Sequence, residues 1–230
     1  MRPRFATVGP LAAASATNIR TASAIAGAGA VVLNGATVTN GVATLDNPRR
    51  VLFTFAAGET LTLTLTGTRW DGQTVSETIA TGAATPGTVS SVLDYKTVTS
   101  VVSSAASNGN VSIGTSSVAG SSWINFDWWL SDGVVAFQVD VTGVVNYTIQ
   151  QTLDDPNNST TPNDPGLSAP TPGNPMLPAN VQWVNCADTT MVNATVTAQS
   201  NYNFAPIWMR VVLNSGTGSV ALTALQHGGS

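Results

Sequence analysis

Charged side chains are scarce in this chain, because only 9% of its 230 residues are Asp, Glu, Lys or Arg, against roughly 25% in an average soluble domain. The net charge of −4 offers no basic surface for nucleic-acid phosphates. Lys, Glu and Arg, which normally cover exposed helix faces, are nearly missing. These absences argue against a helical protein, and we expect no nucleic-acid partner.

Cysteine and long apolar runs are also lacking. Cys186 is the only cysteine, so the chain can form neither an internal disulfide nor a pair of thiolate metal ligands, and we expect it to be a small buried side chain. The apolar runs are far shorter than the roughly 20 residues that cross a bilayer. The first residues contain no apolar core of a signal peptide. We therefore expect no membrane partner and synthesis in a cytosol.

Hydroxyl side chains supply most of the polarity, with 32 Thr and 21 Ser. Residues Thr60–Thr66 alternate Thr and Leu without a fault, which predicts a strand with its three leucines in a core and its threonines in water. The same alternation in Thr74–Ala80 places Glu77 on the apolar face. An edge strand tolerates such a charge, so we expect an edge position there.

Turn dipeptides separate further short strands. Asn34-Gly35 and Asn40-Gly41 each predict a type I′ hairpin turn. Strands recur about every 8–12 residues, which is typical of a β-sandwich. The other predicted strands are Val31–Asn34, Thr37–Asn40, Val42–Leu45, Val51–Phe55, Lys96–Ser103, Asn110–Gly114, Trp123–Leu130, Val135–Val141, Val144–Thr152, Ile207–Leu213 and Ser219–Leu225.

The predicted fold class is all-β, with two β-sandwich domains of jelly-roll or Ig-like type. They span residues 29–120 and 121–230, with the boundary in a stretch of Gly and Ser near 119–122. Residues 1–28 predict an extended N-terminal arm, ordered only against a neighbouring subunit, so that its deletion leaves both domains folded. Its large apolar residues are spaced too widely for a core of their own: Phe5, Val8, Leu11, Ile19 and Ile25.

A long loop at residues 154–180 holds most of the chain's prolines, so no strand can run through it. It also collects oxygen ligands of the kind that Ca²⁺ prefers. Their spacing matches no known calcium motif, and turn-rich loops contain the same residues, so we favour plain turn chemistry and expect no metal or other cofactor. The residues in question are Asp154, Asp155, Asn157, Asn158 and Asp164.

The aromatic segment Trp123–Trp129 has two interpretations. Its side chains Trp123, Phe126, Trp128 and Trp129 could form a platform on which sugars stack, or they could pack in a core or a subunit interface. We favour packing, and the glycan platform stays open as an alternative.

Catalysis is not expected. His227 is the only histidine and lies three residues from the C-terminus, where frayed backbone would not hold a base in place. No Gly-x-Ser-x-Gly motif is present. The carboxylates Asp127, Asp132 and Asp140 do not form a convincing acid–base pair. We therefore predict that the protein is not an enzyme and has no catalytic, cofactor-binding or metal site.

Several stretches resemble a widespread, poorly characterised family of tailed-bacteriophage virion proteins. The resemblance covers most of residues 30–225. It lies in the general style of the sequence, and none of the matching residues has a catalytic or ligand-binding role. The stretches are Asn34-Gly35, Ala43–Asp46, Arg49–Leu52, Leu65–Thr68, Ser76–Ile79, Lys96–Val101, Tyr147–Pro156 and Thr217–Thr223.

This resemblance implies a structural component of the virion, made in the cytoplasm of a host bacterium. The expected function is capsid decoration or cementing, with the major capsid protein as a partner. The alternatives are a tail tube, collar or fibre-associated ring protein, which would have tail proteins as partners, and a carbohydrate-binding module for host attachment. The shortage of charge further predicts a homo-oligomer, with a trimer as the first expectation.

Overall fold

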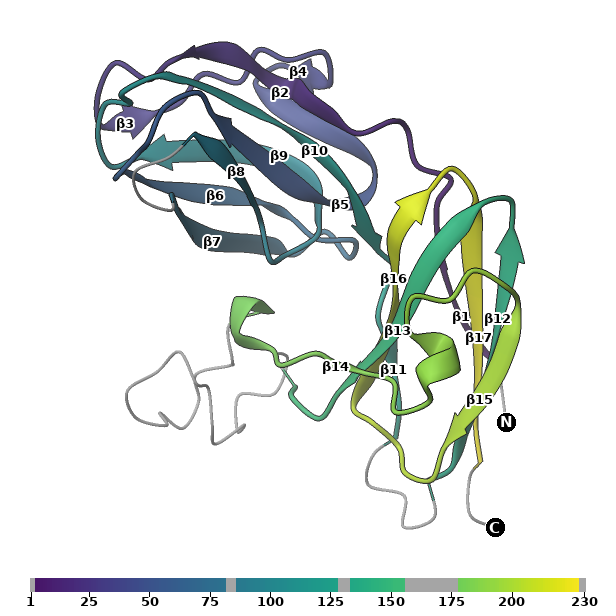
Figure 1. Ribbon diagram of the computed structural model, residues 1–230. Coiled ribbons are helices and arrows are strands. Elements are labelled where there is room, and N and C mark those ends of the chain that lie inside the picture. The colour runs from purple at the N-terminus through teal and green to yellow at the C-terminus, as the bar shows by residue number, and fades with distance from the viewer. Residues whose placement is uncertain (1–2, 82–85, 128–132, 156–177, 228–230) are drawn as a thin grey trace, which may run out of the picture. The chain divides into compact units, whose positions relative to one another are not determined.

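The computed structural model describes residues 3–81, 86–127, 133–155 and 178–227 (Figure 1). Within these ranges the chain is all-β with antiparallel strands, so the predicted fold class is confirmed at that level. The described residues contain no α-helix, only the two short 3₁₀ segments η1 (Pro178–Asn180) and η2 (Thr189–Met191). None of this helical structure is long or apolar enough to cross a membrane.

The chain separates into two compact units. Unit 1 contains residues 1–11 and 120–230, and unit 2 contains residues 12–119. Unit 2 therefore occupies one continuous stretch of sequence that interrupts unit 1 after its first strand. The predicted domain at residues 29–120 begins later than unit 2 does, because residues 12–28 belong to unit 2 and were expected to be part of the arm.

Strand β5 organises unit 2. Its C-terminal half pairs with β10 on one side and β8 on the other, while its N-terminal half pairs with β9. The strands of unit 2 thus form two sheet halves that share β5, with the orders β2-β10-β5-β8 and β5-β9-β6-β7, and their apolar faces form a β-sandwich-like core. The strands are β2 (Ser15–Ala24), β3 (Gly29–Ala30), β4 (Val38–Thr39), β5 (Val42–Phe55), β6 (Thr62–Thr68), β7 (Thr74–Ala80), β8 (Gly87–Ser90), β9 (Tyr95–Ser103) and β10 (Asn110–Gly120).

Three predictions from local sequence patterns can be compared with unit 2. Two of them are confirmed and one is wrong. Leu63 and Leu65 of β6 are fully buried, as the Thr-Leu alternation predicted. Asn40 and its following glycine have φ values of 51° and 79° between β4 and β5, which confirms the type I′ turn. The hairpin predicted at Asn34-Gly35 is wrong. A Cβ at Gly35 would lie 2.2 Å from the carbonyl oxygen of Asn18, so this glycine permits a close backbone approach instead.

Unit 1 contains the four-stranded sheet β1-β17-β12-β15 and a second group of paired strands in the order β14-β13-β16, with β11 joined to β16. The connections β12–β13 and β16–β17 each pass from one group of strands to the other, so apolar side chains of both groups share one core. The strands are β1 (Arg4–Val8), β11 (Ile124–Asn125), β12 (Val135–Thr142), β13 (Val145–Thr152), β14 (Val184–Asn185), β15 (Ala198–Tyr202), β16 (Trp208–Gly216) and β17 (Ser219–Gln226).

The extended arm expected over residues 1–28 is not confirmed. Strand β1 pairs with β17 in unit 1, and β2 pairs with β10 in unit 2. Val8, Leu11, Ile19 and Ile25 are buried, and Phe5 alone of the five large apolar residues is exposed. Their wide spacing misled the sequence interpretation, because backbone pairing with existing strands supplies the stability that a denser apolar pattern would otherwise provide.

Two buried arginines hold the N-terminal segment of unit 2 in place. The guanidinium of Arg49 donates to the carbonyl oxygens of Ser116 and Ala12, at 3.1 Å from Nε and 2.9 Å from Nη1. The guanidinium of Arg20 donates to the carbonyl oxygens of Ser23, at 2.8 Å, and of Val111. Ser116 and Val111 lie where the register of β10 with its neighbours shifts. The arginines therefore satisfy carbonyls near the points where the ladder is interrupted.

Replacing Arg49 with Met is expected to lower the free energy of unfolding by about 3 kcal/mol, because the buried carbonyls lose their donors and Asp46 loses its ion pair. Urea unfolding would measure this loss. Arg4→Ala is the matched control, since Arg4 lies exposed on β1. A change in Arg49→Met of less than about 0.5 kcal/mol, as at ordinary surface positions, would contradict the clamping role.

Deleting residues 2–24 is expected to lower the melting temperature by at least ~10 °C, because it removes β1 and β2 with the buried Val8 and Ile19. Thermal unfolding followed by circular dichroism would show the shift. An unchanged melting temperature would restore the interpretation of this segment as a free arm.

Candidate functional site

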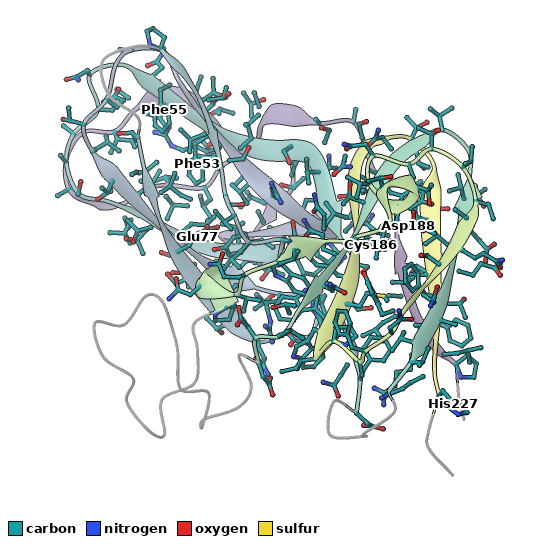
Figure 2. All side chains as sticks on the ribbon, turned by 60° about the horizontal axis from the view of Figure 1, so that its bottom comes forward. Phe53, Phe55, Glu77, Cys186, Asp188 and His227 are labelled. Atoms are coloured by element: carbon teal, nitrogen blue, oxygen red, sulfur yellow. The ribbon has the colours of Figure 1, made fainter. Side chains whose placement is uncertain are left out.

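The residues considered for catalysis do not converge. His227 is exposed and follows the last strand, near the C-terminal end of the chain (Figure 2). The backbone of Asp127 is hydrogen-bonded to the side-chain amide of Gln226 on β17, whereas Asp140 pairs with Ala221 on the same strand. Ala221 and Gln226 are five residues apart, which is about 17 Å along a strand, so the two carboxylates are not neighbours. Asp132 lies outside the described residues. Within those residues no three His, Cys, Asp or Glu side chains gather where a metal ion could bind.

Cys186 is a buried free thiol, as expected. Its backbone N–H donates to the carbonyl oxygen of Ile149 at 2.9 Å. Burial, and then the neighbouring Cys186, raise the pKa of the Tyr202 hydroxyl. Both side chains are part of the packing of unit 1.

The two described carboxylates of the 154–180 loop each hold a neighbour within unit 1. Asp154 accepts from the backbone N–H of Gln182 at 2.7 Å, and Asp155 accepts from the indole Nε1 of Trp208 at 3.3 Å. The remaining oxygen ligands, Asn157, Asn158 and Asp164, lie outside the described residues.

Trp123 is the buried member of an aromatic cluster whose other two rings, Trp183 and Trp208, are half-buried. It is 9% exposed and packs edge-on against Trp183 and Trp208, with ring centroids 5.0 and 6.0 Å away. The guanidinium of Arg210 lies 4.2 Å from the centroid of the Trp183 ring, which is cation–π distance. Phe126 is fully buried. A sugar platform needs an open ring face, so Trp123 and Phe126 do not form one, and Trp128 and Trp129 lie outside the described residues.

The side chain of Glu77 links β7 to the segment that follows β8, two parts of unit 2 that lie at sheet edges. It lies on β7, the outermost strand of its sheet, which is an edge position of the kind that tolerates such a charge (Figure 1). Its carboxylate accepts from the backbone N–H groups of Val92 and Leu93, at 2.9 and 3.4 Å. These residues follow β8, which lies at the edge of the other sheet. Burial outweighs the two backbone donors and raises the pKa of Glu77, with a smaller contribution from the charge of Asp94.

Uncharged hydroxyl side chains from β6, β7 and β9 form one continuous outer face of unit 2. Thr64 pairs with Thr78, and Thr66 lies between Ser76 and Ser100. The hydroxyl oxygens of Thr66 and Ser76 are 3.1 Å apart. This hydroxyl face consists of Thr62, Thr64, Thr66, Thr68, Thr74, Ser76, Thr78 and Ser100, all exposed or half-buried.

Positive charge is largely absent from the surface for a structural reason. Four of the arginines are at most 5% exposed: Arg20, Arg49, Arg69 and Arg210. Lys96 donates to two backbone carbonyls, and Arg50 faces Asp94 at 3.8 Å. Arg4 alone is exposed among the cations of the described residues.

No family model matches this chain, and no curated protein or solved structure is significantly similar to it. Its function must therefore be inferred from the surfaces and clusters themselves.

The raised pKa of Glu77 predicts a pH dependence of stability. Folding favours the protonated carboxyl, so its contribution is fully present below the ordinary pKa of 4.5 and is lost as the pH rises through the higher pKa of the folded state. The stability of Glu77→Gln relative to the unchanged protein should therefore increase from pH 4 to pH 8 in urea unfolding. Carboxylates that do not interact with Glu77 are shared and cancel in the difference. A difference that is independent of pH would contradict this assignment.

Proposed function

We propose that the protein is a structural component of a tailed-phage virion, where it decorates the capsid and cements neighbouring capsomers. The resemblance of its strand segments to such virion proteins supports the proposal, and so does the antiparallel all-β architecture. The observation that carries it is the uncharged hydroxyl face of unit 2, in a protein that buries four of its arginines. Isolated soluble proteins usually keep a more charged surface, so a neutral strand face favours a protein partner.

In this proposal the hydroxyl face lies against the major capsid protein. The threonine methyl groups and the exposed Val102 supply apolar area, and the hydroxyl groups both donate and accept hydrogen bonds across the contact. Because the face has no charged groups, forming the contact does not incur the free-energy cost of removing charges from water. Each unit acts as a β-sandwich domain, and the subunits form a closed homo-oligomer, first expected to be a trimer.

Counting copies of the protein against the major capsid protein in purified virions tests the location. A decoration protein is expected in hundreds of copies per particle. A ring-sized number of about six or twelve would place the protein in the tail as a tube, collar or fibre-associated ring, and absence from the particle would overturn the proposal.

Thr64→Lys is expected to reduce the occupancy of the protein on virions at least about tenfold, because an unpaired ammonium would be buried at the contact. Thr142→Lys is the matched control, since Thr142 is an exposed threonine on β12 in unit 1 and does not belong to the hydroxyl face. Both variants should keep the melting temperature of the unchanged protein. Equal occupancy of the two variants would show that the hydroxyl face is not the attachment surface.

A further inference from the structure

A groove of about 480 Å³ lies on the outer surface of the sheet β1-β17-β12-β15 in unit 1. This volume falls within the range of about 300–1,000 Å³ that is usual for small-ligand sites. The side chains that line it come from three neighbouring strands and are Ala136, Gln138, Gln199, Asn201, Thr223 and Leu225. The hydroxyl face of unit 2 shares no residue with this groove.

The hollow follows from the sizes of side chains in register. One row across the sheet runs from Leu225 through Ala136 to Asn201, so the smallest side chain lies between two longer ones. The next row runs from Thr223 through Gln138 to Gln199. Because outward side chains repeat every second residue along a strand, the longer side chains surround the space above Ala136.

The polar groups that line the groove are neutral, and each can both donate and accept hydrogen bonds. The amide of Gln138 is also oriented, because its Nε2 donates to the Oδ1 of Asp140 at 2.7 Å. A carboxylate can only accept, so the amide oxygen and the second N–H of Gln138 remain for another partner. Asn201 is held in a similar way, with its Nδ2 donating to Asn203 at 3.3 Å. Amides that are oriented before binding lose less entropy when a ligand arrives.

Apolar contact area lies beside these amides. Leu225 is 41% exposed at the groove, and Phe5 is 66% exposed on β1, directly opposite Thr223. The row that contains both groove glutamines, Gln138 and Gln199, therefore ends in the exposed aromatic ring of Phe5. Amides that meet hydroxyl groups, together with an aromatic ring that meets C–H groups, match the two kinds of surface that a sugar ring presents.

We propose that this groove binds a neutral oligosaccharide. One sugar ring lies over Ala136, its hydroxyl groups bonded to Gln138, Gln199 and Asn201, and the chain of sugars continues across Thr223 toward Phe5. Neutrality is dictated by the lining, which contains no charge to pair with an ionic ligand, and the adjacent Asp140 repels anions. An extended peptide would instead add to an edge of the sheet. The affinity of one such open site should be modest, with a Kd of about 0.1–1 mM.

The test uses the full-length protein on an array of neutral oligosaccharides built from glucose, galactose and N-acetylhexosamines, with sialylated and sulfated glycans for contrast. The strongest neutral ligand is then titrated by calorimetry against three variants. Ala136→Tyr fills the groove, and Gln138→Leu removes the oriented amide at similar size. Ala80→Tyr makes the same Ala-to-Tyr change at an exposed position on β7 of unit 2.

Binding of neutral glycans is expected, with at least a tenfold weaker affinity in Ala136→Tyr and Gln138→Leu and no change in Ala80→Tyr. The proposal is overturned by a lack of neutral binding up to about 10 mM, by a preference for charged glycans, or by full binding in both groove variants. A change in oligomeric state in Ala136→Tyr without any glycan binding would identify the groove as a protein interface and also overturn it. Because none of these measurements uses virions, their outcome is separate from that of the decoration proposal.

Discussion

The pairing of buried guanidinium groups with backbone carbonyls supports the architecture of unit 2. Strand β10 must pair with both β2 and β5, and its register shifts against each of them. Such shifts leave carbonyl oxygens without ladder partners, and a buried carbonyl without a donor is costly. Arg20 and Arg49 supply these donors with a rigid, multiply donating group. The irregular pairing that binds the N-terminal segment to the sheet is therefore tolerated.

Because several arginines are buried, few positively charged side chains remain on the surface of the protein. The chain has eight cations in all, and the clamps and ion pairs of the interior engage most of them. What remains on the strand faces is mainly hydroxyl and amide groups, which occur both on the hydroxyl face of unit 2 and in the groove of unit 1. The proposed attachment and the proposed sugar binding thus have a common origin in where the charges are placed.

Local alternation predicted the strands well where one face is buried, as in β6, and it also identified the edge position of Glu77. It failed where stability comes from distant partners. Ile19 is buried because β10 pairs with β2, and Gly35 is needed because Asn18 approaches it. The groove illustrates the same limit. Alternation places Gln138 on an outer face, but only the register of β12 with β15 shows that Gln199 lies beside it.

The interruption of unit 1 by unit 2 has a consequence for biosynthesis. Arg4 of β1 pairs with Ala224 of β17, so the first strand is translated long before its partner. Unit 2 is complete once residue 119 has left the ribosome. At about 5–20 residues per second, the remaining chain takes roughly 5–20 s to appear. During that interval unit 2 can fold on the nascent chain, while β1 still lacks its partner strand β17.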